Sequence, residues 1–464
     1  MQESHGECLD LSKTSARLTT GEVVPTLLQL TIPMIWGLFS IIGFNLADTY
    51  FVGQLGSLEL SALGFTIPVV MVLGTLTLGL GTGTASALAR ALGEGNPRKA
   101  RRLATDSLVL ALLIVSVLVV AGILTIEPLF RALGAPESVL PLIEDYMSVW
   151  YVAMIFLVIP MVGNSIIRAT GDTKFPGLIM TFAALMNFVL DPFLIFGWAG
   201  LPALGVKGAA IATLISRVVT TIPSLYILCY REKILDSRLP RLSELLNSFK
   251  EILYVGIPAA GSNMIQPITG MFITSMLAGY GPESVAAFGL VQRMESFVLI
   301  IALALASALG PFLGQNWGAG KKERVEKAIW VSVKFCLVWG VISAAALGFC
   351  SDFIVRAFSD DPAICTVAVL YLVLVPWTYG LESVRLIVNS ALNAIRKPLP
   401  ATGLMVLRMF GIYIPLAWTL SSIYGIPGIF WATCLANLIV GLLSLFTLWR
   451  ILRSTFPEEN KGEV

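Results

Sequence analysis

PMIWGLFSIIGFNLADTYFVGQLGSLELSALG, at residues 33–64, recurs 225 residues later as PAAGSNMIQPITGMFITSMLAGYGPESVAAFG, at residues 258–289. The two stretches align without a gap and share a leading proline. Further matched pairs are Gly56 with Gly281, Ala62 with Ala287 and Gly64 with Gly289. Repetition over this length predicts a chain built of two equivalent halves.

The repeat extends beyond this stretch. Residues 27–103 match residues 252–328 at the same spacing, and Asn164-Ser165 recurs as Asn389-Ser390. Two similar bundles of helices can rock about a shared cavity, so an apolar chain with this duplication is typical of a transporter.

The composition places the chain in a membrane. Of its 464 residues 56% are hydrophobic and only 13% are charged, about half of the roughly 25% that soluble domains carry. Long uncharged runs occur at 23–47, 60–89, 107–126, 252–282 and 409–449. Each is long enough for at least one spanning helix of about 20 residues, and too long and continuous for a barrel strand.

The sequence therefore predicts an all-α membrane protein with twelve transmembrane helices in two pseudo-symmetric six-helix lobes. We expect an N-terminal tail over 1–24, an N-lobe over 25–230, a linker over 231–248, a C-lobe over 249–453 and a tail over 454–464. The predicted helices are 25–52, 59–88, 102–126, 139–169, 175–198, 204–229, 249–279, 284–315, 326–350, 362–393, 399–421 and 425–452. The polar first 24 residues predict no cleavable signal peptide.

Lysine and arginine counts in the loops predict the orientation. On the other side of the predicted bundle, the loops carry only Arg131, Lys207 and Arg356. The loops after the even-numbered helices carry 18 such residues: Arg90, Arg98, Lys99, Arg101, Arg102, Arg168, Lys174, Arg231, Lys233, Arg238, Arg241, Lys250, Lys321, Lys322, Arg324, Lys327, Arg396 and Lys397. We expect both termini in the cytoplasm.

Two residue types argue against a metal or catalytic centre. The six cysteines are scattered without metal-like spacing, and His5 is the only histidine. No set of nucleophile, base and orienting group is evident, so we expect neither an enzyme nor a cofactor. The net charge of +2 reflects the loop bias and not a nucleic-acid surface. We expect contact with membrane lipids, no nucleic acid and no obligate protein partner.

Carboxylates inside apolar segments are costly and mark functional sites. Asp48 in helix 1 aligns with Ile273 in the other half, and Asp191 in helix 5 aligns with Ile414. The repeat thus supplies the shape twice and these charges once, which places the predicted ion site in the N-lobe.

Neighbouring polar residues suggest the rest of that site. Asn187 and Asp191 are four residues apart and share a helix face, and Thr213 lies in a Gly- and Ala-rich helix that can approach closely. Oxygens of Asp48, Asn187, Asp191 and Thr213 would hold Na⁺ as the metal ion, or a proton on a carboxyl. Two alternatives stay open: Asp191, before Pro192, caps a broken helix, or Asp48 is merely interfacial.

Other candidates carry weaker signals. Glu295 and Glu382 are secondary acids, and Glu382 with Arg385, three residues on, could form a structural ion pair. Asn164 and Gln266 could line a substrate cavity or join helices by hydrogen bonds. Pro33 removes a backbone hydrogen bond and is a candidate hinge.

Several segments together resemble the multidrug and toxic compound extrusion (MATE) family, in particular its DinF-like prokaryotic branch. The resemblance covers nearly the whole chain. The segments that carry it are Asn45 to Gly53, Ala89 to Gly95, Ala169 to Asp172, Asn187 to Pro192 and Gly314 to Gly320.

The resemblance implies a V-shaped pair of lobes in a prokaryotic inner membrane. It also implies export of cationic or amphipathic small molecules in exchange for H⁺ or Na⁺. The matched Asp48, Asn187, Asp191 and Thr213 would form the cation site, with Asn164 beside it and Pro33 at the bend of helix 1.

The chain departs from the family pattern at two places. Phe44, a candidate cavity residue, stands where many relatives carry tyrosine, and residues 252–282 lack the acid of another branch. We expect a secondary active multidrug efflux antiporter. The alternatives are a lipid-linked precursor flippase of the related superfamily, and a passive channel or receptor.

Overall fold

The computed structural model describes residues 16–236, 238 and 240–455, so His5, Cys8 and the outer parts of the predicted tails lie outside the described residues. Every regular element within these ranges is helical. The first half contains η2 (Arg17–Thr19), α1 (Val23–Gly53), α2 (Ser57–Gly93), α3 (Pro97–Leu124), α4 (Ile126–Ala132), α5 (Leu140–Thr170), α6 (Lys174–Phe196), η3 (Trp198–Gly200), α7 (Gly205–Tyr226) and η4 (Ile227–Arg231).

The second half repeats this order. It contains α8 (Leu242–Ala278), α9 (Pro282–Gly318), α10 (Lys322–Arg356), α11 (Pro362–Leu374), η5 (Val375–Thr378), α12 (Tyr379–Ala394), α13 (Pro398–Val406), η6 (Leu407–Tyr413), α14 (Ile414–Tyr424) and α15 (Ile426–Thr455).

Eleven helices of the described chain are long and apolar enough to cross a membrane. Helix α8 has 37 residues, as many as α2 and α9, but it is less apolar because it carries Asn263, Gln266 and two internal prolines. It packs along α2 at the junction of the two halves. The described residues therefore supply six membrane-length helices per half.

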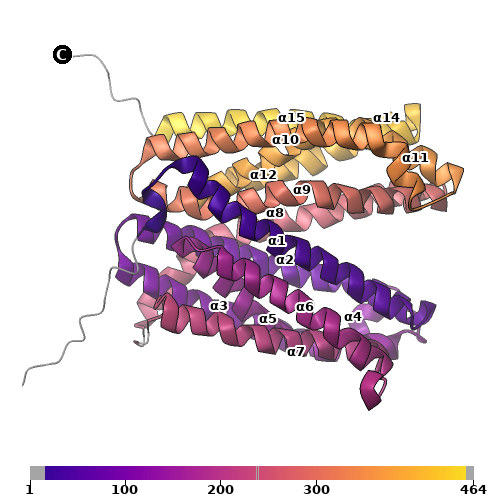
Figure 1. The fold of residues 1–464 in the computed structure, drawn as a ribbon, viewed down its shortest axis with the longest axis horizontal. Coiled ribbons are helices and arrows are strands. Elements are labelled where there is room, and N and C mark those ends of the chain that lie inside the picture. Colours follow the sequence, from indigo (N-terminus) through magenta and orange to yellow (C-terminus); the bar gives the residue numbers. More distant parts are fainter. Residues whose placement is uncertain (1–15, 237, 239, 456–464) are drawn as a thin grey trace, which may run out of the picture.

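The two halves form separate lobes (Figure 1). The N-lobe (α1–α7) and the C-lobe (α8–α15) meet at the end where the described chain begins and ends, and they diverge toward the other end. The end where the lobes meet is called the basic end, because the lysine- and arginine-rich loops between α2 and α3 and between α9 and α10 lie there. The end where the lobes diverge is called the far end. The predicted all-helical, two-lobed, V-shaped fold is confirmed.

Glycines let the lobes touch at the basic end. A Cβ atom on Gly83 of α2 would collide with the backbone carbonyl of Ile252 in α8. A Cβ on Gly93 would collide in the same way with the carbonyl of Gln315 in α9. Only glycine permits backbones to approach this closely, so the sequence of α2 fixes where the lobes meet.

Polar contacts reinforce this junction. The Ser86 hydroxyl donates to the Asn393 carbonyl at 2.5 Å, and the Arg90 guanidinium donates to the Ala394 carbonyl at 3.0 Å. Both donors belong to α2 and both acceptors to α12 of the C-lobe. The Gln315 amide of α9 also donates to the Ala169 carbonyl of α5 at 2.7 Å. These hydrogen bonds join the lobes at the basic end.

Residues 16–22, within the N-terminal tail predicted over 1–24, form a strap across the junction. The backbone N–H of Leu18 donates to Gln315 Oε1 at 2.9 Å, and Asn316 donates to the Leu18 carbonyl at 3.0 Å. The Arg324 guanidinium binds the carbonyls of Leu18, Thr20 and Gly21. The Leu18 side chain is buried, so the strap is part of the packed structure.

The linker between the lobes is shorter than predicted. The predicted linker over 231–248 is wrong in its second part, because α8 begins at Leu242. The Glu244 carboxylate accepts from the Arg241 backbone N–H at 3.3 Å, so a polar first turn extends the helix beyond the apolar stretch.

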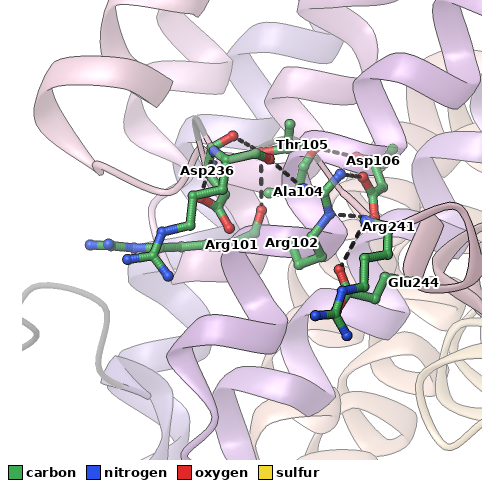
Figure 2. A network of polar contacts seen from close by, with 10 residues as sticks. Arg101, Arg102, Ala104, Thr105, Asp106, Asp236, Arg241 and Glu244 are labelled. Atoms are coloured by element: carbon green, nitrogen blue, oxygen red, sulfur yellow. Dashed lines mark hydrogen bonds and ion pairs between the residues drawn. The ribbon is translucent and has the colours of Figure 1, made fainter.

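The remaining linker is tied to α3, as Figure 2 shows. The Thr105 hydroxyl accepts from the Asp236 N–H at 2.8 Å, and Arg102 donates to the Arg238 carbonyl at 2.8 Å. Arg102 also pairs with the fully buried Asp106.

Two further elements differ from the prediction. The short α4 occupies part of the segment between predicted helices 3 and 4. The predicted helix 362–393 is divided into α11 and α12 by the 3₁₀ turn η5, which contains Pro376. Proline has no N–H to donate, so the helical hydrogen-bond ladder is interrupted there.

Candidate functional site

The strongest candidate site lies between α6 and α7 of the N-lobe. Asn187 and Asp191 occupy successive turns of α6 and are buried, with exposed fractions of 1% and 0%. Thr213 faces them from α7 and is also buried. The two helices pack closely because a Cβ on Gly208 of α7 would collide with the Leu194 carbonyl of α6.

Asn187 bridges the other two residues. Its Nδ2 donates to the carboxylate oxygens of Asp191 at 3.2 and 3.0 Å, and its Oδ1 accepts from the Thr213 hydroxyl at 3.2 Å. This amide orientation is assigned from the partners, since the opposite one would turn the amide oxygen toward the carboxylate. The structure thus brings together three of the four predicted cation-site residues.

Asp48 approaches this group from α1. It lies less than two turns before the end of α1 at Gly53, is half-buried, and interacts electrostatically with Asp191. Its Oδ1 atom is buried and has no hydrogen-bond partner among the described residues. An unpaired buried carboxylate oxygen is costly, so Asp48 offers a ready ligand for a cation or a proton.

The helix-cap alternative for Asp191 is wrong. Helix α6 runs without a break from Lys174 through Pro192 to Phe196, so Asp191 lies inside a helix and not at its first turn. Membrane helices tolerate internal proline where neighbouring groups compensate the lost hydrogen bond. The Asp191 carboxylate is left to interact with side chains.

Sequence reasoning missed a cation near this group. Arg217 of α7 lies one turn beyond Thr213, and its Nε atom is buried without a hydrogen-bond partner in the described chain. The buried Tyr146 of α5 is within electrostatic reach of Arg217, Asp48 and Asp191. The signal in the sequence is an arginine inside an apolar helix, which is as costly there as an acid. The sequence prediction rested on acids alone.

Pro33 and Phe44, the two candidates predicted in helix 1, both lie on α1. Helix α1 continues through Pro33. At this level α1 packs tightly on α6, because a Cβ on Gly177 would lie 2.5 Å from the Pro33 carbonyl oxygen. Phe44 is half-buried on α1. A hinge at Pro33 stays a prediction.

One cavity between the lobes has a lining that does not include the predicted cavity residues, whose substrate role stays a prediction. Side chains of α2, α5, α8, α9 and α12 enclose a volume of about 180 Å³ near the basic end. Asn164, Gln266 and Phe44 are not among them. Asn164 is buried within the N-lobe and Gln266 is exposed, whereas Asn389, the repeat partner of Asn164, does line it.

The C-lobe acids belong to a different kind of cluster. Arg385 donates to both carboxylate oxygens of Glu382, at 2.9 and 2.5 Å, and both side chains are buried. The predicted ion pair is therefore present. Arg408 of η6, which sequence reasoning also missed, lies 3.6 Å from Glu382 and donates to Asn437 at 2.7 Å.

The other C-lobe acid, Glu295, accepts from the Tyr371 hydroxyl at 2.8 Å. Both C-lobe acids thus have partners, whereas one oxygen of Asp48 has none. In the described residues no group of three or more His, Cys, Asp or Glu gathers as a transition-metal site would require. Carboxylate, amide and hydroxyl oxygens suit a hard cation such as Na⁺, or a proton.

Comparison with known families places the chain. The profile of the family described as MatE matches residues 33–193 and, a second time, residues 258–419. The two matches begin 225 residues apart and together cover more than half of the chain. The chain belongs to the MATE family. It is thus a member of a family of multi-pass membrane transporters, with one copy of the family pattern in each lobe.

Known MATE relatives resemble the chain over almost its whole length. It is 38% identical to a protein named FAD transporter from Shewanella oneidensis, over 94% of this chain and 96% of that protein. It is 24% identical to the multidrug export protein MepA of Staphylococcus saprophyticus, over 91% and 93%. A solved structure of the Vibrio cholerae MATE transporter VcmN superposes with a TM-score of 0.89 at 30% identity, covering 96% and 98%.

In this MATE protein the segment Gly314 to Gly320 has a clear structural task. Gln315 and Asn316 are fully buried and hold the strap, while Gln315 also binds the N-lobe. Gly318 lies so close to the Arg90 carbonyl that a Cβ would collide with it. This segment therefore closes the basic end, and its role was not evident from the sequence.

Proposed function

We propose that this MATE protein is a secondary active antiporter that exports small amphipathic molecules in exchange for H⁺ or Na⁺. The observation that supports it best is the buried Asp191–Asn187–Thr213 group, with the unpaired oxygen of Asp48 beside it. The corresponding C-lobe positions are Ile273 for Asp48 and Ile414 for Asp191. One lobe would couple to the ion, and both lobes would form the path.

Ion binding would act through the cost of burying charge. Two carboxylates in an apolar lobe repel one another and lose hydration, and a proton or a Na⁺ ion relieves both costs. A lobe conformation that brings Asp48 toward Asp191 would therefore bind the ion more tightly. The ion would favour that conformation in the same proportion, and would lower substrate affinity if the substrate prefers another one.

The loop charges set the proposed direction. The basic end would face the cytoplasm of a prokaryotic inner membrane, because lysine and arginine are retained on that side. The described conformation, with the lobes joined at the basic end, would then be open to the outside. Substrate would enter after the Ser86–Asn393 and Arg90–Ala394 contacts separate.

The substrate class has two lines of support. The resemblance to the family implies cationic or amphipathic compounds, and MepA is named as a multidrug export protein. The more similar Shewanella relative is named as a FAD transporter. We therefore include an anionic flavin dinucleotide among the candidate substrates of this chain.

The test is transport in proteoliposomes under a Na⁺ gradient and a pH gradient, imposed separately. A cationic dye and FAD would be followed for wild type, Asp191→Asn and a matched control, Glu137→Gln, which alters an exposed acid. We expect one gradient to drive transport, Asp191→Asn to abolish the response and Glu137→Gln to keep it.

Two results would contradict the proposal. Full gradient-driven transport by Asp191→Asn would move the coupling site elsewhere, with Glu382 the next acid to test. No transport of either substrate under either gradient would favour the flippase alternative.

A further inference from the structure

The cavity between the lobes lies on the axis that relates the two repeats. Its N-lobe wall includes Gly81 and Thr82 of α2, and its C-lobe wall includes Ala306 and Ser307 of α9. These are equivalent positions, since each pair is separated by the repeat spacing of 225 residues. The cavity is therefore the place where both lobes present the same face to one solute.

One equivalent pair breaks the symmetry of charge between the two walls of the cavity. Arg168 of α5 lines the cavity, and the residue at its repeat position is Asn393 of α12. No carboxylate is among the described residues that line the cavity. The fold thus supplies the shape twice and a positive charge once, at a point well separated along the N-lobe from the acids near the far end.

The Arg168 side chain keeps donors available. Its Nη2 atom donates to the Ser165 hydroxyl at 2.7 Å. A guanidinium carries five N–H donors in a planar fork. No described carboxylate lies within ion-pair distance of Arg168, in contrast to Arg90, which is 3.7 Å from Glu251. Arg168 is half-buried, and a partly desolvated cation without an acid partner would be stabilised by an anionic ligand.

Amide groups line the opposite wall. Asn263 of α8 and Asn389 and Asn393 of α12 all border the cavity. Asn393 is buried and donates to Asn389 Oδ1 at 3.3 Å. A guanidinium facing neutral amide and hydroxyl groups is the chemistry that recognises a phosphate group, through bidentate hydrogen bonds and further neutral donors.

We propose that this cavity binds a phosphate group, with Arg168 as its charged ligand and the C-lobe amides as its neutral ones. The inference rests on the proposed export function and narrows its substrates to include phosphate-bearing solutes such as a flavin dinucleotide. Because Arg168 belongs to the N-lobe and the amides to the C-lobe, the bound group bridges the lobes. Its binding favours the conformation in which they are joined at the basic end.

The first experiment measures binding without any ion gradient. Full-length protein in dodecyl maltoside, a detergent without phosphate, is titrated into FAD and into riboflavin, which lacks phosphate, and flavin fluorescence anisotropy is followed. Wild type is compared with Arg168→Gln, Arg168→Lys and a matched control, Arg131→Gln, at an exposed far-end arginine.

We expect wild type and Arg131→Gln to bind FAD more tightly than riboflavin. Arg168→Gln loses about tenfold or more in FAD affinity, the size of a hydrogen bond to a charged group, and binds riboflavin as before. Arg168→Lys recovers part of the loss, since it keeps the charge without the fork. Inorganic pyrophosphate competes with FAD in wild type and in Arg131→Gln, but not in Arg168→Gln. A thermal melt of each variant checks folding.

A second arm separates a solute phosphate from a lipid headgroup. Short-chain phosphatidylglycerol is added to the same micelles. If the site takes solute phosphate, FAD binding is unchanged; if it takes a headgroup, the lipid displaces FAD from wild type, and the lipid's own binding depends on Arg168. Either result supports a phosphate site and names its source. The proposal is overturned if neither FAD, pyrophosphate nor the lipid depends on Arg168.

This outcome is independent of the coupling experiment. Binding that depends on Arg168, together with no gradient-driven transport, would overturn the proposed function and leave the phosphate site standing. Gradient-driven transport together with FAD binding that ignores Arg168 would overturn the phosphate site alone.

Discussion

The acids inside the two lobes have different partners. In the N-lobe, Asp191 is held by a neutral amide, and Asp48 keeps one oxygen unpaired. In the C-lobe, Glu382 is held by Arg385, with Arg408 nearby. A carboxylate paired with a guanidinium has little to gain from a proton or Na⁺, whereas one bound only by an amide has much to gain. The same fold thus carries a candidate ion site in one lobe and a structural ion pair in the other.

The structural interpretation of Glu382 predicts an asymmetry between single and double variants. Arg385→Met should destabilise the protein by about 3–5 kcal/mol, because it leaves a buried carboxylate without its main partner. The double variant Glu382→Gln with Arg385→Met should recover most of this loss. Thermal unfolding in detergent, followed by tryptophan fluorescence, measures both. An unchanged melting temperature for Arg385→Met would remove the structural role and reopen Glu382 as an ion site.

At this scale the sequence predicted the site only in part. Asn187 and Asp191 could be found because a spacing of four residues puts them on one helix face whatever surrounds the helix. Arg217 and Arg408 were not among the predicted site residues, because the prediction rested on acids inside apolar segments and not on basic residues. Asn164 and Gln266 stay predictions as cavity residues, because the face that a membrane helix turns to a cavity depends on how the lobes meet, which helix periodicity does not contain.

At the scale of elements, α2 organises the molecule. Its glycines meet α8 and α9, and its Ser86 and Arg90 reach α12. The sequence predicted the existence of most helices, since hydropathy is a local property. It did not predict that α8 begins at Leu242 or that η5 divides α11 from α12, because local capping and a single proline decide these boundaries.

The packing of α2 on α8 predicts the effect of added bulk. Gly83→Val should push the lobes apart at the basic end, at a cost of about 1–3 kcal/mol to the joined conformation. Spin labels are attached at Glu94→Cys and Glu323→Cys, one on each lobe. Double electron–electron resonance should then report a longer distance between the two labels. Gly74→Val on the same helix is the control, because a Cβ there meets nothing within 4 Å. An unchanged distance in Gly83→Val would mean that glycine packing does not hold this junction.

At the scale of the whole molecule, the distribution of lysine and arginine between the two ends predicts how the protein is oriented in the membrane. The proposed orientation predicts that an impermeant maleimide labels Glu137→Cys, at the far end, on intact cells. It should label Glu323→Cys, at the basic end, only after the cells are permeabilised. Both variants are made in a background without the natural cysteines. The reverse labelling pattern would place the basic end outside and contradict the proposed orientation.

The strap also constrains the order in which the protein can be made. Leu18 is synthesised before every membrane helix, but its hydrogen-bond partner Gln315 lies 297 residues later in the chain. Leu18 therefore cannot form this hydrogen bond until the whole N-lobe and the first helices of the C-lobe have been made. The strap can reach its described position only after α9 and the start of α10 have been made, so we expect its docking to follow insertion of the N-lobe.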